Sequence, residues 1–237
     1  MSIRILQLYP ELMNLSGDIG NLMAVTRRLS ELGLRWEVDR ASVGDPMPFG
    51  EYDLILAGNA PLSALLAAMR DMAPRAAELR AAMEAGRVFL FTGSARCLLG
   101  GDLRLRSGQC LSGARILAES HREVARFTGE VVATRPGMGN TAYLGSFDRE
   151  LETDAASERP LFQTLRGIGD KPEAIYEGVF RGNLYATYLL GPLLVRNPEL
   201  LEEIVAKLAG SRYQARGESF DAEAKAAALS RLERRKI

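Results

Sequence analysis

Short apolar runs alternate with amphipathic stretches over the first hundred residues of the chain. Residues 3–9 (IRILQLY), 53–58 (DLILAG) and 88–93 (VFLFTG) are almost wholly apolar, which is typical of strands buried on both faces of a parallel sheet. Residues 34–39 (LRWEVD) alternate apolar and polar positions and predict a further strand. The apolar pattern therefore predicts four strands before residue 94.

Helical periodicity fills the gaps between these strands. After the first strand, apolar residues recur at spacings of three and four, at Leu22, Val25, Leu29 and Leu32. This spacing predicts an amphipathic helix that ends at Gly33. Two alanine-rich helical pieces follow the third strand, separated by Pro74 and ending at Gly86. Alternating strands and helices predict right-handed crossovers and a parallel sheet covered by helices.

The second half of the chain has a different pattern. Its apolar segments are short and punctuated by glycine, which favours antiparallel hairpins over further strand–helix units. Residues 186–200 (ATYLLGPLLVRNPEL) predict a buried strand, a turn and a helix, with Asn197 as the cap and Pro198 at the first helical position. We expect one domain over residues 1–210 and a charged C-terminal tail over 211–237 that forms a helix.

Composition and charge narrow the classes of function. The 237 residues are 47% hydrophobic and 25% charged, the proportions of an ordinary globular protein. Thirty basic and thirty acidic side chains cancel, which disfavours nucleic acid as a partner. The chain has two cysteines, no signal-peptide pattern and no run long enough to span a membrane, so we expect a cytoplasmic protein without disulfides or metal.

The expected ligand sites lie at the carboxyl ends of the strands, over residues 10–21, 58–61 and 92–96. Residues 86–100 (GRVFLFTGSARCLLG) predict a strand, a sharp turn and a helix, the arrangement that holds a nucleophile in many α/β enzymes. The turn falls on Gly93, which has no side chain, and on Ser94, which has no evident base. We therefore interpret Ser94 mainly as a helix cap and only as a weak candidate nucleophile.

Other polar residues receive structural interpretations. We predict that Cys97, inside the helix and beside leucines, is a buried and unreactive thiol. Ser16 and Asp18 lie in a glycine-containing segment that matches no phosphate-binding motif, and we interpret them as turn and cap residues. His121 is the only histidine, and its polar neighbours favour an exposed surface position over a role as a base.

Four separated motifs resemble those of one enzyme family. Residues 8–21 (LYPELMNLSGDIGN) are similar to its LYPDLMNxYGDxGN, and residues 86–100 align without gaps with its GKPxLxICGGYQLLG. Residues 142–147 (AYLGSF) and 177–200 (EGVFRGNLYATYLLGPLLVRNPEL) are similar to its RTYLG and EGV…GTYLHGPLLPKNPxL. Over roughly residues 3–209 the chain therefore resembles the CobB/CobQ-like class I glutamine amidotransferases of the cobyric acid synthase type, and most closely the glutaminase-like subunit of lipid II isoglutaminyl synthase.

The resemblance implies a three-layer, flavodoxin-like α/β fold with a mainly parallel sheet and an antiparallel extension. It also implies glutamine hydrolysis, in which a cysteine attacks the side-chain amide, an oxyanion hole binds the intermediate and a histidine acts as base. In such systems the ammonia passes to a Mur-ligase-like, ATP-dependent partner, or to a fused synthetase in the cobalamin branch. The N-terminal motif and the length of the chain favour the cell-wall context.

Position by position, the family's cysteine falls on Gly93 and its histidine on Leu190. The loop that supplies an oxyanion donor falls on Gly58, Asn59 and Ala60. The residues expected to contact a ligand are thus Gly58, Asn59, Ala60, Ser94 and Arg96. Because the nucleophile and its base are both replaced, we expect no intact catalytic residues and no cofactor.

Three hypotheses follow. The leading one is an amidotransferase-like subunit without glutaminase activity, paired with a Mur-ligase-like amide ligase in cell-wall metabolism. A second is a working amidotransferase or hydrolase that uses Ser94, Arg96 or Asn59, with His121 brought near by the fold. A third is a sensor that still binds glutamine but no longer hydrolyses it.

Overall fold

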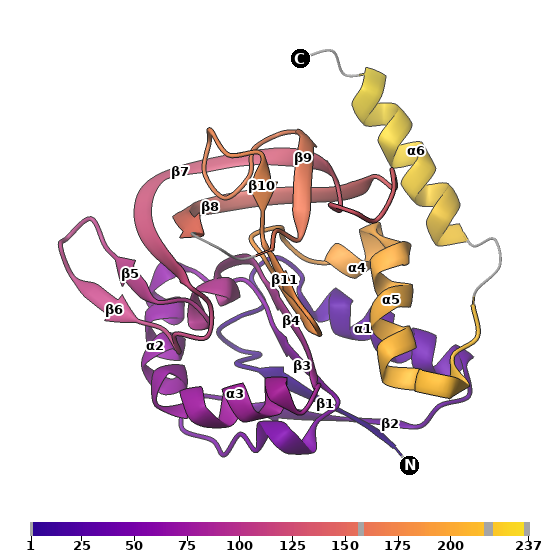
Figure 1. The fold of residues 1–237 in the computed structure, drawn as a ribbon, viewed down its shortest axis with the longest axis horizontal. Coiled ribbons are helices and arrows are strands. Elements are labelled where there is room, and N and C mark those ends of the chain that lie inside the picture. Colours follow the sequence, from indigo (N-terminus) through magenta and orange to yellow (C-terminus); the bar gives the residue numbers. More distant parts are fainter. Residues whose placement is uncertain (1, 156–158, 216–219, 235–237) are drawn as a thin grey trace.

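A six-stranded, mainly parallel sheet forms the centre of the molecule (Figure 1). The structure is a computed structural model that describes residues 2–155, 159–215 and 220–234. The strand order is β11-β12-β4-β3-β1-β2, and only the edge strand β11 is antiparallel to its neighbour. The strands are β1 (Ile3–Leu8), β2 (Trp36–Ala41), β3 (Leu54–Ala57), β4 (Val88–Thr92), β11 (Val179–Arg181) and β12 (Leu184–Thr187).

Helices cover both faces of this sheet and complete the three layers. They are α1 (Ile19–Glu31), α2 (Leu62–Met72), α3 (Ala76–Glu84), α4 (Leu193–Arg196) and α5 (Pro198–Ala209), whereas a further helix, α6 (Phe220–Arg234), does not cover the sheet. The core on one face packs α2 and α3 against residues such as Ile55 and Phe89, and the core on the other face packs α1 and α5 against Ile5 and Leu90. The expected α/β fold class is confirmed.

A second, largely antiparallel sheet follows in the order β10-β9-β7-β5-β6, with β8 paired to β7. Figure 1 shows β7 and β8 side by side across the top of the molecule. The strands are β5 (Asp102–Arg104), β6 (Cys110–Ser112), β7 (Glu119–Thr134), β8 (Tyr143–Ala155), β9 (Phe162–Arg166) and β10 (Tyr176–Glu177). The expected antiparallel extension is present.

Two expectations for this half of the chain are wrong. β7 and β8 are 16 and 13 residues long rather than short, and they pair from Glu119↔Ala155 to Ala133↔Tyr143 with one irregularity after Glu123. The strand β12 is not a simple hairpin segment, because it also pairs in parallel with β4. Its four residues are all buried, as a strand between two neighbours requires.

The expected start of a helix at Pro198 is confirmed, since α5 spans Pro198–Ala209, but Asn197 does more than mark this start. It stands at the N-cap position of α5 without a side-chain capping bond. Its Oδ1 instead accepts the Leu144 N–H at 2.8 Å, and its Nδ2 donates to the Leu144 carbonyl at 2.8 Å. The residue therefore joins α5 to β8, which forms one wall of the site described below.

The tail contains the expected helix, α6, which lies against the outside of the molecule (Figure 1). Lys225 contacts Glu199 of α5, and Leu232 is buried. The division of the chain at residue 210 stays a prediction. Within the described part of the chain, no helix combines the length and apolar character needed to cross a bilayer.

Candidate functional site

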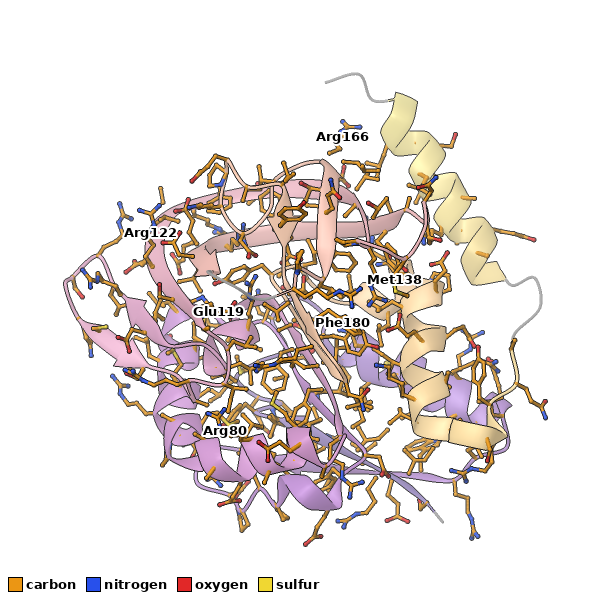
Figure 2. The ribbon with its side chains drawn as sticks, in the orientation of Figure 1. Arg80, Glu119, Arg122, Met138, Arg166 and Phe180 are labelled. Atoms are coloured by element: carbon orange, nitrogen blue, oxygen red, sulfur yellow. The ribbon has the colours of Figure 1, made fainter. Side chains whose placement is uncertain are left out.

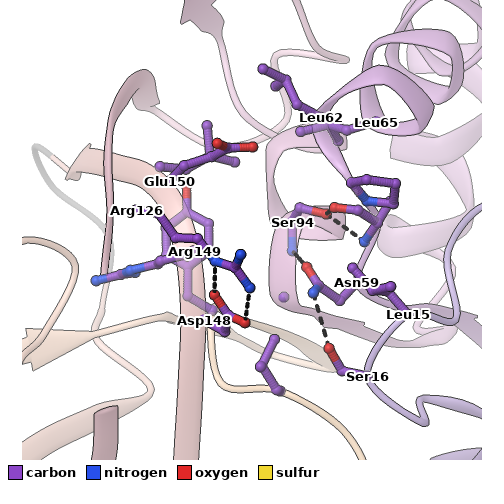
Figure 3. A pocket seen from close by; sticks show the side chains of 16 residues that line it. Leu15, Ser16, Asn59, Leu62, Leu65, Ser94, Arg126, Asp148, Arg149 and Glu150 are labelled. Atoms are coloured by element: carbon purple, nitrogen blue, oxygen red, sulfur yellow. Dashed lines mark hydrogen bonds and ion pairs between the residues drawn. The ribbon is translucent and has the colours of Figure 1, made fainter. Parts of the chain in front are cut away.

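A pocket of about 420 Å³ opens beyond the carboxyl ends of β3 and β4. In Figure 3, Ser94 and Asn59 lie on one side, and Asp148, Arg149 and Glu150 of β8 lie on the other. The lining residues are Leu15, Ser16, Asn59, Ala60, Pro61, Leu62, Leu65, Gly93, Ser94, Arg126, Asp148, Arg149, Glu150, Leu151, Tyr188 and Leu190. The pocket therefore lies at the position where ligands bind in open α/β sheets, beyond the carboxyl ends of the strands.

Gly93 and Leu190 line this same pocket. Gly93 follows β4 directly and has φ +61°, a left-handed conformation that glycine adopts without strain. We call this turn between β4 and the next helical segment the elbow. Leu190 follows β12, is 9% exposed, and donates its N–H to the Ser146 carbonyl. The fold therefore brings the two positions together, and neither carries a group that can attack a carbonyl or accept a proton.

Side chains of the chain itself bond the backbone N–H groups at the elbow. The Ser94 N–H donates to Asn59 Oδ1 at 3.0 Å, and Asn59 Nδ2 donates to Ser16 Oγ at 3.0 Å (Figure 3). The Ala60 N–H donates to Ser94 Oγ at 2.8 Å, and this hydroxyl donates to the Ala60 carbonyl at 3.1 Å. The Ser94 N–H at the elbow and the Ala60 N–H in the loop after β3 are thus both satisfied internally.

These bonds correct the interpretation of Ser94 as a helix cap. The segment after β4 is a short 3-10 helix, η3 (Gly93–Leu98), with Thr92 at its N-cap position. The Ser94 hydroxyl bonds both polar groups of the Ala60 peptide, and so it joins the loop after β3 to the elbow. The contact has a sequence separation of 34 residues, which no local pattern reveals.

Arg96 does not line the pocket, contrary to its expected role in binding. Its side chain is fully buried, and its guanidinium bonds Glu119 at 2.7 Å and Asp170 at 2.9 Å. These two carboxylates raise the pKa of Arg96 well above its ordinary value, against the effect of burial. Glu177 lies 3.8 Å from the same guanidinium, and burial together with the Asp170 charge raises its pKa to about 7.

The expectation that His121 is exposed is wrong. His121 lies on β7 and is 2% exposed, with Nδ1 2.7 Å from Thr153 Oγ1 and 2.9 Å from the Tyr188 hydroxyl. Burial lowers its pKa to about 3, so the ring is neutral at physiological pH. The alternation of β7 explains the error, since Glu119 and His121 point inward while Arg122 points out (Figure 2).

His121 has no hydrogen bond to Ser94 among the described residues. Its Nδ1 is engaged by Thr153 and Tyr188, while the Ser94 hydroxyl is engaged by Ala60. A general base must lie within hydrogen-bond reach of the proton it removes, directly or through one water. The arrangement does not support a Ser94–His121 pair.

Cys97 is a buried thiol, as predicted. It is fully buried within η3, and its Sγ lies 3.5 Å from the Tyr188 hydroxyl. Burial raises the pKa of the thiol to about 12, which keeps it protonated and unreactive near neutral pH.

Asp18 occupies the N-cap position of α1 but makes no capping bond. Its carboxylate accepts the Thr92 hydroxyl at 2.8 Å and the Ser16 N–H at 3.2 Å, and burial raises its pKa. Gly58 does not line the large pocket, because it packs against Asp18; a Cβ there would lie 2.4 Å from the Asp18 Cβ. The turn role of Ser16 and Asp18 is confirmed, and the capping role of Asp18 is wrong.

The β7–β8 pair contributes charged residues that the sequence motifs do not indicate. Arg126 bonds Asp148 at 2.6 Å at the pocket, with the Arg126 side chain exposed and Asp148 half-buried (Figure 3). Arg149 is 7% exposed and lies 4.4 Å from the Tyr188 ring. Burial lowers its pKa, and its Nε and Nη1 have no hydrogen-bond partner in the described residues. Only the long antiparallel pairing brings these residues to the pocket.

A site for a metal ion is not evident. Over residues 2–155, 159–215 and 220–234, no three His, Cys, Asp or Glu side chains are placed to hold one together. The buried carboxylates Glu119 and Asp170 bond Arg96 instead.

The three-layer α/β architecture is that of the glutamine amidotransferase-like fold. A solved glutamine amidotransferase matches with a TM-score of 0.52 and 16% identity, over 86% of this chain and 98% of that one. The glutaminase domain of Trypanosoma brucei CTPS with bound acivicin matches with a TM-score of 0.57 and 11% identity, over 93% and 99%. These likenesses establish the fold.

In sequence, the chain is similar to the subunit GatD of lipid II isoglutaminyl synthase (glutamine-hydrolyzing). It is 25% identical to GatD of Streptococcus pneumoniae (strain ATCC BAA-255 / R6) over 214 residues, covering 89% of this chain and 82% of the relative. It is also 25% identical to GatD of Staphylococcus aureus (strain N315) over 196 residues, covering 82% and 79%. No protein-family model matches the chain.

Proposed function

We propose that this chain is a glutamine amidotransferase-like subunit that does not hydrolyse glutamine. The observation that carries the proposal is the presence of Gly93 and Leu190 on one pocket, at the positions where the resembling family has its cysteine and histidine. Removing one member of a nucleophile–base pair lowers the rate of hydrolysis by about 10⁶-fold in a well-studied protease. Here both members are replaced.

The hydrogen bonds at the elbow support the same proposal. An oxyanion hole needs backbone N–H groups that are free to bind a developing negative charge. In this chain the Ser94 N–H donates to Asn59, and the Ala60 N–H donates to Ser94. Loss of one such donor costs about 10² to 10³ in rate in a protease. The pocket therefore lacks three separate contributions to glutaminase chemistry.

We further propose that the partner is a Mur-ligase-like, ATP-dependent amide ligase. The homology to GatD, a subunit of an enzyme named for lipid II, supports a cytoplasmic role in cell-wall metabolism rather than in cobalamin synthesis. In such a complex this chain has a structural or regulatory role. The ligase then takes free ammonia or another amine as its nitrogen donor.

A second candidate is a subunit that still binds a small ligand such as glutamine. The pocket of about 420 Å³, with the Arg126–Asp148 pair at one wall, favours this candidate. Glutamine present at 100 times its dissociation constant would stabilise the folded chain by about 2.7 kcal/mol. A rise in Tm with glutamine, and none with leucine, would support binding without catalysis.

The test of the leading function combines pull-down from the native host with an ammonia-release assay. We expect an ATP-dependent amide ligase to co-purify with the full chain, and no ammonia release from glutamine with or without that ligase. The matched positive control is Streptococcus pneumoniae GatD, whose name records glutamine hydrolysis. Clear turnover by this chain above the buffer rate would contradict the proposal, and the absence of any ligase would contradict the proposed partner.

A further inference from the structure

The Asn59 side chain occupies the space directly beside Gly93. Asn59 is placed by the end of β3 and Gly93 by the end of β4, which are adjacent parallel strands. A Cβ built on Gly93 would lie 2.5 Å from the Asn59 Cβ and 2.6 Å from its Oδ1. The Asn59 Cβ is fixed by the backbone, so rotation of the side chain does not relieve the clash. Position 93 accommodates no side chain while Asn59 is present.

Hydrogen bonds hold Asn59 in this place from both ends of its amide. Oδ1 accepts the Ser94 N–H at 3.0 Å, and Nδ2 donates to Ser16 Oγ at 3.0 Å. The residue is 7% exposed. A displaced Asn59 would leave the buried Ser94 N–H without its present partner, which costs free energy. The side chain is therefore a fixed part of the pocket rather than a movable cover.

We propose that Asn59 is an internal occupant of the reaction centre, with its amide oxygen bound where a substrate carbonyl oxygen would otherwise bind the Ser94 N–H. The inference rests on the proposed function only in treating Gly93 as the position of the replaced nucleophile. Two consequences follow. Glycine at position 93 is required by the nearby Asn59 side chain and is also favoured by its φ of +61°. A ligand of this pocket contacts the walls that carry Leu190 and the Arg126–Asp148 pair, and does not place a carbonyl oxygen on the elbow.

The same geometry predicts the outcome of repairing the site. Gly93→Cys with Leu190→His does not restore a reactive thiol, because the new Cβ meets Asn59. Replacing Asn59 with glycine removes the clash and frees the Ser94 N–H in one step. Asn59 is thus a specificity-determining residue, because it excludes a side chain from position 93 and prevents an acyl substrate from bonding the Ser94 N–H.

A double-mutant cycle in thermal unfolding measures the coupling between the two positions. Gly182→Ala is the matched control, since Gly182 has φ +63° with nothing within 4 Å of its built Cβ, and it isolates the backbone strain. We expect Gly182→Ala to lower Tm by about 2–4 °C. In the unmodified chain, Gly93→Ala should lower Tm at least twice as much as Gly182→Ala does, or prevent folding. In the Asn59→Gly background, Gly93→Ala should lower Tm no more than Gly182→Ala does.

Thiol alkylation supplies a second readout, with Cys110→Ser in every variant because Cys110 is exposed. We expect iodoacetamide to modify the thiol of Asn59→Gly/Gly93→Cys at least about tenfold faster than that of Gly93→Cys, since accessibility controls thiol reactivity. The buried Cys97 reports unfolding in the same sample.

Two results would overturn the inference. One is that Gly93→Ala lowers Tm equally in the unmodified chain and in the Asn59→Gly background. The same conclusion follows if the Asn59→Gly/Gly93→Ala variant does not fold although Asn59→Gly and Gly182→Ala each fold. The other is equal alkylation rates at position 93 in the two backgrounds while Cys97 stays protected. Ammonia release from glutamine by the unmodified chain would instead overturn the proposed function and leave the Asn59 measurements unaffected. The decisive comparison is therefore the Tm cycle on variants of the full chain.

Discussion

Arg96 is the centre of a buried charge cluster behind the pocket. Its guanidinium bonds Glu119 and Asp170, lies 3.8 Å from Glu177, and lies 5.1 Å from the centre of the Tyr188 ring. Glu177 in turn accepts the Tyr188 N–H at 2.6 Å. The cluster therefore positions Tyr188, a pocket residue, from behind. This explains why a side chain that the sequence places next to the elbow contributes nothing to the pocket directly.

Arg96→Met tests the structural role of this residue. The substitution keeps a long side chain but leaves several buried carboxylates without their cation. We expect a loss of about 3–5 kcal/mol in the free energy of unfolding, measured by urea denaturation. The control is Arg27→Met, which breaks a pair with Glu31 on a side chain that is 67% exposed and should cost less than about 0.5 kcal/mol. A loss from Arg96→Met as small as the control would contradict the role.

At the scale of elements, Asn197 joins α5 to the wall of the pocket. The residue is fully buried, bonds both backbone groups of Leu144 on β8, and donates to the Leu193 carbonyl at 2.9 Å. The oxygen and nitrogen of its side-chain amide thus hold together the helix α5, the strand β8 and the short helix α4. This connection helps to place β8 over the pocket, together with the pairing of β8 to β7 and the bond from the Leu190 N–H to the Ser146 carbonyl.

We expect Asn197→Ala to lower the free energy of unfolding by about 2–3 kcal/mol, since it leaves buried backbone groups of Leu144 unpaired. The same variant should increase hydrogen exchange at the Leu144 amide, measured by mass spectrometry. Asn140→Ala is the control, because Asn140 is exposed in the turn between β7 and β8. Unchanged exchange at Leu144 would contradict the proposed connection.

At the scale of the whole molecule, two buried groups act oppositely on stability as pH changes. The pKa of His121 falls from 6.5 to about 3 on folding, so between these values the unfolded chain binds more protons and stability rises with pH. The pKa of Glu177 rises from 4.5 to about 7, so in that window the folded chain binds more protons and stability falls as pH rises. Between about pH 4.5 and 6.5 the two contributions oppose each other.

Removing either group should therefore change the pH dependence in opposite directions. For His121→Gln, the Tm difference from the unmodified chain should shrink as pH falls below 6.5. In free energy of unfolding, the difference between the two proteins should shrink by up to about 1.4 kcal/mol per pH unit. For Glu177→Gln, the difference should shrink as pH rises from 4.5 to 7. Thermal unfolding at half-unit steps between pH 4.5 and 7.5 checks both. Parallel curves for all three proteins would contradict the assignment.

The elements of the first half were predictable because their patterns are local. The apolar runs at residues 3–9, 53–58 and 88–93 and the helical spacing after the first strand each lie within a dozen residues. They lead to the parallel sheet and hence to the edge where the pocket forms. The motifs likewise singled out Gly93 and Leu190, whose side-chain chemistry is known from residue identity alone.

The tertiary structure decided what depends on contacts between distant residues. His121 is buried because the β7–β8 pair places it against Tyr188, 67 positions along the chain, while the adjacent residues Ser120 and Arg122 point the other way. Asn59 fills the elbow through a bond to Ser94 across 35 positions. Periodicity describes only which face of one element a residue occupies, so it contains no information about which side chain from another element meets it there. The sequence thus determined that positions 93 and 190 carry no reactive side chain, and the fold decided which side chains lie beside them.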